Sequence, residues 1–160
     1  MKITQALADL GVGEQTLGTE QKQALDQDGF FVVEGALSEE SCAKMCYRFD
    51  QIHQVEGKRA GWQVHKEDGA TRLSNLLNKT TEFDDCLYTK PLLAAAYHLL
   101  KSDCKIYGFT AIMVQLPVDN YSVLNSLILL DPFTTDNVAT RIVPGSHLSG
   151  LQAEDVVAIR

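Results

Sequence analysis

The stretch that decides the expected fold is NSLILLDPFTTDNVATRIVPGSH, residues 125–147. It begins with an aliphatic run, passes through an acidic turn, returns to apolar residues at 140–143 and ends in Pro144-Gly145. Short aliphatic and β-branched runs bounded by turn residues are typical of strands. The pattern therefore predicts strands at 123–130 and 140–143.

The segments on either side extend this pattern. Residues 105–116 predict another strand, followed by a turn at 117–120, and residues 156–159 predict a strand at the end of the sequence. Near the N-terminus, the Phe-Phe-Val-Val run at 30–33 lies between glycines and predicts a short buried strand.

Helices are expected before the predicted central strands, at 19–25, 39–55 and 90–101. Thr19 is the expected N-cap of the first helix, and Ser38 that of the second. The second helix has a single apolar face, and Pro91 suits the first turn of the third. The face consists of Cys42, Met45, Cys46, Phe49 and Ile52. Helices followed by strands favour an α+β or mainly β class.

The remaining segments carry weaker patterns. Residues 1–18 are expected to form a loose leader with one short helix, and 57–70 an exposed loop. Residues 71–87 are expected to be helical in part.

Composition narrows the class of protein. A chain of 160 residues with 45% hydrophobic residues is expected to form one domain. Its net charge of −7 and scattered basic residues argue against nucleic acid and anionic membranes as partners. The sequence has no apolar run that would span a membrane and no signal peptide, so a cytoplasmic location is expected.

The cysteines are also consistent with the expected cytoplasmic location. Cys42, Cys46, Cys86 and Cys104 form no CxxC pair, and no further ligands lie at zinc-finger spacing. We predict that they are reduced thiols in the core.

Two segments together resemble the phytanoyl-CoA dioxygenase family. The first is DGFFVVEGALSEE at 28–40, and the second is the 125–147 stretch that ends in Pro-Gly-Ser-His. The resemblance implies a double-stranded β-helix, a cupin-like jelly roll, with the N-terminal helices packed outside it. It places a single domain at 19–160, shortened near 111–119 and cut off at its C-terminus.

The resemblance also implies chemistry. Members of the family hold Fe(II) with a His-x-Asp pair and a distant His, and they use 2-oxoglutarate to oxidise a small organic substrate. Polar side chains of the central strands help to hold 2-oxoglutarate. By resemblance, Thr110, Gln115 and Asn125 are the cofactor-binding candidates. The substrate and the oligomeric state cannot be deduced from the sequence.

The sequence departs from the family where the iron should bind. The His-x-Asp pair belongs in the interval 112–121, which contains no histidine. The second His and the 2-oxoglutarate Arg would follow Arg160, and Val138 stands where the family has Gly. No catalytic residue and no metal ligand is therefore assigned.

The histidines elsewhere in the sequence are weaker candidates for metal ligands. His65 and Glu67 form a His-x-Glu pair, but they lie far upstream of the family's metal strand. His147 is expected to be a structural turn residue. His53 and His98 are expected on helices, with solvent or backbone as their partners.

Two explanations of the absent triad stay open. In the first, the parent protein is an oxygenase, and these 160 residues omit an internal loop and C-terminal strands. In the second, the chain is a non-catalytic binding or structural relative on the same scaffold. A plain helical interaction protein is disfavoured by the predicted strands of the second half.

Overall fold

The fold is taken from a computed structural model, which describes residues 3–62, 71–101, 124–130, 140 and 142–149. Several sequence-based predictions lie outside these residues. They are the strands at 105–116 and 156–159, the turn at 117–120, the shortened interval at 111–119 and the departure at Val138.

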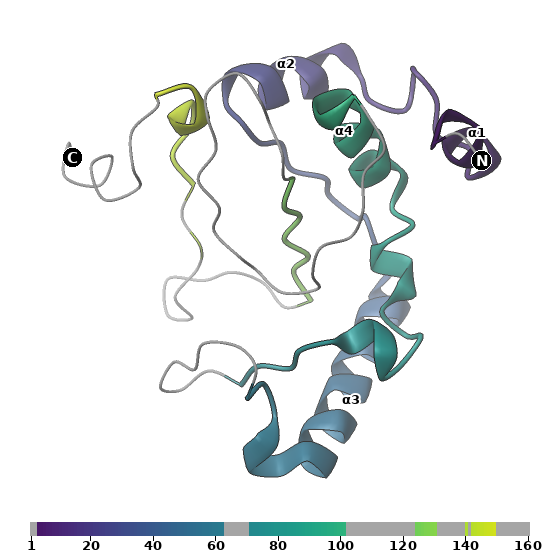
Figure 1. Cartoon of the computed structure of the whole chain (residues 1–160), viewed down its shortest axis with the longest axis vertical. Coiled ribbons are helices and arrows are strands. Elements are labelled where there is room, and N and C mark those ends of the chain that lie inside the picture. Colours follow the sequence, from purple (N-terminus) through teal and green to yellow (C-terminus); the bar gives the residue numbers. More distant parts are fainter. Residues whose placement is uncertain (1–2, 63–70, 102–123, 131–139, 141, 150–160) are drawn as a thin grey trace.

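Four α-helices carry the described part of the chain. They are α1 (Ile3–Asp9), α2 (Thr19–Gln27), α3 (Glu39–Glu56) and α4 (Lys90–Leu100). Single 3-10 turns join or follow them: η1 (Gly57–Arg59), η2 (Leu76–Asn78), η3 (Asp84–Cys86) and η4 (Ser146–Leu148). Figure 1 shows α2 and α4 side by side at one end of the molecule and α3 at the other.

Helix α3 begins and ends as the sequence predicts. The Ser38 hydroxyl accepts a hydrogen bond from the Ser41 N–H at 3.1 Å, which satisfies one of the unpaired amides of the first turn. Glu39 and Glu40 add negative charge at the positive end of the helix. At the other end, Gly57 takes a positive φ of 50°.

Helix α2 differs from the prediction at its start. The N-cap is Gly18, and Thr19 is the first helical residue. The Gln21 side chain reaches back to accept from the Gly18 N–H at 3.0 Å, which is the one half of a capping box that a glycine N-cap can form. For α4, the predicted place of Pro91 in the first turn is confirmed.

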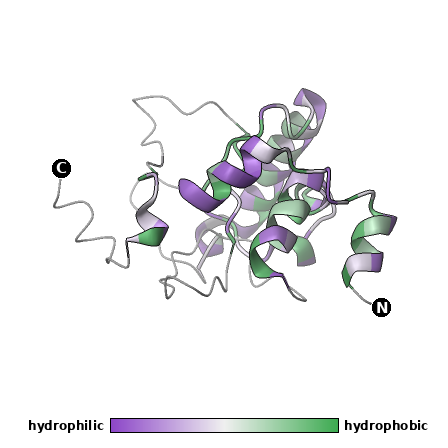
Figure 2. Cartoon of the chain, turned by 90° about the horizontal axis from the view of Figure 1, so that it is seen from above, coloured by the Kyte–Doolittle hydropathy of each residue, from purple (hydrophilic) through white to green (hydrophobic). Residues whose placement is uncertain are grey.

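The apolar side chains form two separate cores. The first cluster lies among α1, α2 and α4, and its buried residues are Leu7, Val12, Leu17, Leu25, Ala94 and Ala95. The second cluster lies between α3 and the η2–η3 segment, and its buried residues are Met45, Ile52, Leu73, Leu76, Phe83 and Cys86. Figure 2 shows hydrophobic and hydrophilic residues on the same helices, as expected when one side faces a core.

Residues 1–18 contribute to the first cluster. The expected short helix is present as α1, and Leu7, Val12 and Leu17 are all buried. This segment therefore packs against α2 and α4.

The predicted jelly roll is wrong. The structure describes helices and turns, and none of the residues it describes forms a β-strand. The described residues of the predicted strands at 30–33, 123–130 and 140–143 have no regular structure. Val32, expected to be buried, is 75% exposed. An apolar run becomes a strand only where a neighbour pairs with its backbone, and sequence pattern alone does not supply that neighbour.

Residues 124–130 instead run alongside both cores. Leu124 packs against the first cluster, and Ile128 and Leu130 pack against the second. Leu127 and Leu129 are exposed between them. The aliphatic run that predicted a strand therefore supplies alternate side chains to the two clusters without forming a strand.

None of the helices in the described ranges is long and apolar enough to cross a membrane.

Candidate functional site

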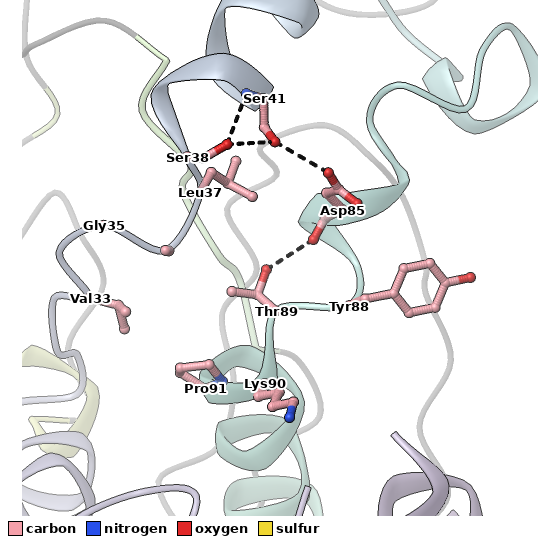
Figure 3. A pocket seen from close by; sticks show the side chains of 11 residues that line it. Val33, Gly35, Leu37, Ser38, Ser41, Asp85, Tyr88, Thr89, Lys90 and Pro91 are labelled. Atoms are coloured by element: carbon pink, nitrogen blue, oxygen red, sulfur yellow. Dashed lines mark hydrogen bonds between the residues drawn. The ribbon is translucent and has the colours of Figure 1, made fainter. Parts of the chain in front are cut away.

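An open groove lies where α3 and α4 begin, and it is the candidate site within the described residues (Figure 3). It has a volume of about 500 Å³. Its walls combine apolar side chains with hydroxyl, carboxylate and ammonium groups. The polar contributors are Ser38, Ser41, Asp85, Tyr88, Thr89 and Lys90, and the apolar ones include Val33, Leu37 and Pro91.

The serine hydroxyls in the groove are used to cap α3. Ser38 Oγ accepts from the Ser41 N–H and donates to Ser41 Oγ at 3.0 Å. Ser41 Oγ in turn lies 3.5 Å from Asp85 Oδ2, the limit of a hydrogen bond (Figure 3). This chain of contacts joins the start of α3 to η3.

Thr89 precedes α4 as Ser38 precedes α3. It is the N-cap residue, but its hydroxyl donates backwards, to the Cys86 carbonyl at 2.9 Å and the Asp85 carbonyl at 3.3 Å. The hydroxyl therefore satisfies carbonyl groups at the end of η3. It fixes the turn that leads into Lys90 and Pro91.

Helix α3 also carries an exposed ion pair, whose two residues do not line the groove. The Lys44 ammonium lies 2.6 Å from Glu40 Oε1, four residues earlier on α3. The hydrogen bond and charge of Lys44 lower the pKa of Glu40, and those of Glu40 raise the pKa of Lys44, to which Asp85 adds. Both side chains are solvent-exposed, so this pair contributes little to stability.

A thiol and a thioether lie behind the groove. Cys86 Sγ is 3.8 Å from Met45 Sδ inside the second cluster. Burial raises the pKa of the Cys86 thiol, and the charges of Asp85 and Cys42 raise it further. A thiol held in its protonated form is a poor nucleophile. The predicted place in the core is confirmed for Cys86, whereas Cys42 and Cys46 are half-buried; none of these three described cysteines forms a disulfide.

The groove is therefore a helix junction with polar walls. The hydroxyls of Ser38, Ser41 and Thr89 already have local partners. The carboxylate that contacts one of them, Asp85, lies 3.5 Å from Ser41 Oγ, at the limit of a hydrogen bond. It offers hydrogen bonds and a lysine to a small polar molecule, but no catalytic pair.

The structure describes one of the three predicted cofactor residues. Asn125 is exposed on the 124–130 segment and is not among the residues that line the groove. Thr110 and Gln115 lie outside the described residues. That these three residues together hold 2-oxoglutarate stays a prediction.

Two histidines meet at a place that the sequence did not predict. His98 of α4 and His147 of η4 both lie against Asp26 near the end of α2. His98 was expected to have solvent or backbone as its partner, but its Nε2 lies 2.8 Å from the Asp26 carboxylate. His53 is half-buried on α3, and His65 and Glu67 lie outside the described residues.

The described residues do not fit an iron site. No group of three His, Cys, Asp or Glu side chains among them could hold a metal ion. In the nearest approach, His147 contacts the main-chain carbonyl of Asp26, so its ring is not directed at the carboxylate that His98 contacts. A facial triad needs two imidazoles and one carboxylate directed at the same point.

Comparison with known proteins gives one distant relative. The chain is 27% identical to the multifunctional dioxygenase prhA of Penicillium brasilianum over 154 residues. The similarity is to a dioxygenase. It covers 78% of this chain and 50% of that protein, so the chain spans about half the length of the relative. No protein-family model matches the chain. No solved structure matches it.

Proposed function

We propose that this chain is part of a dioxygenase that uses Fe(II) and 2-oxoglutarate to oxidise a small organic substrate. The observation that carries the proposal is the similarity to a dioxygenase over 154 residues. The resemblance of residues 28–40 and 125–147 to the phytanoyl-CoA dioxygenase family supports the same chemistry. The described residues supply no iron ligands, so the proposal assigns the metal site to other residues.

A non-catalytic relative is the second candidate function. It is favoured by the engagement of His98 and His147 with Asp26, because imidazoles committed to structural contacts are not available as ligands. It is also favoured by the absence of a histidine from 112–121. In this case the protein would bind a small molecule without oxidising it.

The decisive experiment uses the polypeptide as its own cells make it. Its intact mass is compared with the 17.7 kDa of this chain, and the purified polypeptide is assayed for Fe(II)-dependent release of succinate from 2-oxoglutarate. The proposal expects succinate release that stops when Fe(II) is chelated and returns when it is restored. A native polypeptide of 17.7 kDa that releases no succinate would establish the non-catalytic alternative.

A further inference from the structure

Three segments that are distant in sequence meet at the end of α2. His98 Nε2 lies 2.8 Å from Asp26 Oδ1, and His147 Nε2 lies 3.2 Å from the Asp26 main-chain oxygen. Carbonyl and carboxylate oxygens can only accept, so each Nε2 must carry the hydrogen and donate. One residue of α2 thus receives hydrogen bonds from α4 through its side chain and from η4 through its backbone.

The chain after α2 is shaped to receive the His147 ring. Gly29 has a φ of +84°, which only glycine adopts without strain. A Cβ at Gly29 would lie 2.5 Å from His147 Nδ1, so the ring occupies the space that a side chain would need. Next to this contact, the Gly145 N–H donates to the Asp28 carbonyl at 2.9 Å.

We infer that these contacts form a clasp that positions residues 142–149 against α2. The clasp is defined by His147 Nε2 on the Asp26 carbonyl, the Gly145 N–H on the Asp28 carbonyl, and the His147 ring over Gly29. The Pro-Gly-Ser-His turn therefore holds residues 142–149 to the end of α2, and His147 is the positioning residue. This inference does not depend on the proposed oxygenase function.

The clasp is expected to open as a unit. The two hydrogen bonds and the ring contact join Asp26, Asp28 and Gly29 to Gly145 and His147, so all of them fall within two short stretches, 26–29 and 145–147. If the His147 ring leaves Gly29, the turn moves with it, and the hydrogen bond of the Gly145 amide is lost as well. Exchange of the Gly145 amide hydrogen with solvent therefore reports on the whole clasp.

The test compares two glycines that share a backbone conformation. Gly35 also has a positive φ, +63°, but a Cβ there would meet nothing within 4 Å. Gly29→Ala and Gly35→Ala thus both strain the backbone, and only Gly29→Ala displaces the His147 ring. Amide exchange of the 160-residue chain is followed by NMR, with the Cys42 amide of α3 as an internal reference for intact folding.

We expect Gly29→Ala to speed exchange of the Gly145 amide by about tenfold over Gly35→Ala, because a hydrogen bond is lost. In a His147→Ala background the steric conflict is gone, so the two substitutions should then have equal effects on that amide. Equal effects with His147 in place would overturn the inference. So would a difference that persists without the ring, or a Gly145 amide that is unprotected in the unaltered chain.

Discussion

At the scale of single residues, the Ser38 hydroxyl has the clearest structural role. It accepts the Ser41 N–H at the start of α3 and begins the chain of contacts to Asp85. Ser38→Ala is expected to destabilise the chain by about 1 kcal/mol, because the first turn loses its cap. Ser38→Asp restores an acceptor at the same place and should recover most of the loss. Urea unfolding measures both variants, and an unchanged midpoint for Ser38→Ala would contradict this role.

The thiols make a second prediction at this scale. Cys86 is 3% exposed and burial raises its pKa, whereas Cys42 and Cys46 are half-buried on α3. Since the thiolate is the reactive form, iodoacetamide at mildly alkaline pH should modify Cys86 more slowly than Cys42 and Cys46. Mass spectrometry of the tryptic peptides separates the three sites. In urea the three rates should become similar, and native Cys86 reacting as fast as Cys42 would show that the second cluster is open.

At the scale of elements, the 124–130 segment makes the most specific prediction. Ile128 packs against the second cluster, while its neighbour Leu127 is 52% exposed. Ile128→Asp should therefore cost about 2 kcal/mol or more of unfolding free energy, because it buries a charge among apolar residues. Leu127→Asp should change stability by less than about 0.5 kcal/mol. Comparable losses in the two urea titrations would mean that the segment does not lie as described.

The helices could be predicted from sequence because their signals are local. Ser38, the acidic first turn and the spacing of Met45 and Ile52 lie within one helix and specify α3 without reference to other segments. The strands could not be predicted in this way. The Phe-Phe-Val-Val run and residues 124–130 have the composition of strands, but a strand also needs a paired backbone elsewhere in the chain.

At the scale of the whole molecule, contacts between distant residues were the part that sequence could not supply. His98 is 72 residues from Asp26, and His147 is 121 residues from it. Near these residues the sequence shows only two turns, Asp28-Gly29 and Pro144-Gly145. A turn motif does not indicate which distant segment it will contact. The sequence likewise did not predict that the apolar side chains form two separate cores. A helical protein was disfavoured because strands were predicted in the second half of the chain. None of those strands forms in the described residues.

The candidate site gives a prediction about metal binding by this chain. The interval 112–121 has no histidine, and the described residues gather no metal-binding group. We therefore expect the 160-residue chain to bind Fe(II) weakly in an anaerobic titration, without a stoichiometric end point. His53→Ala should leave the titration unchanged. Stoichiometric binding that His65→Ala abolishes would instead assign the site to the His65–Glu67 pair.

The most direct test of the proposed dioxygenase function is the fate of molecular oxygen. An enzyme of this class splits O₂ and places one oxygen atom in the succinate formed from 2-oxoglutarate, so the native polypeptide can be assayed under ¹⁸O₂ without knowing its substrate. The proposal predicts succinate carrying one ¹⁸O atom, dependent on Fe(II) and on the polypeptide. Unlabelled succinate, or none from iron-loaded native polypeptide, would contradict it.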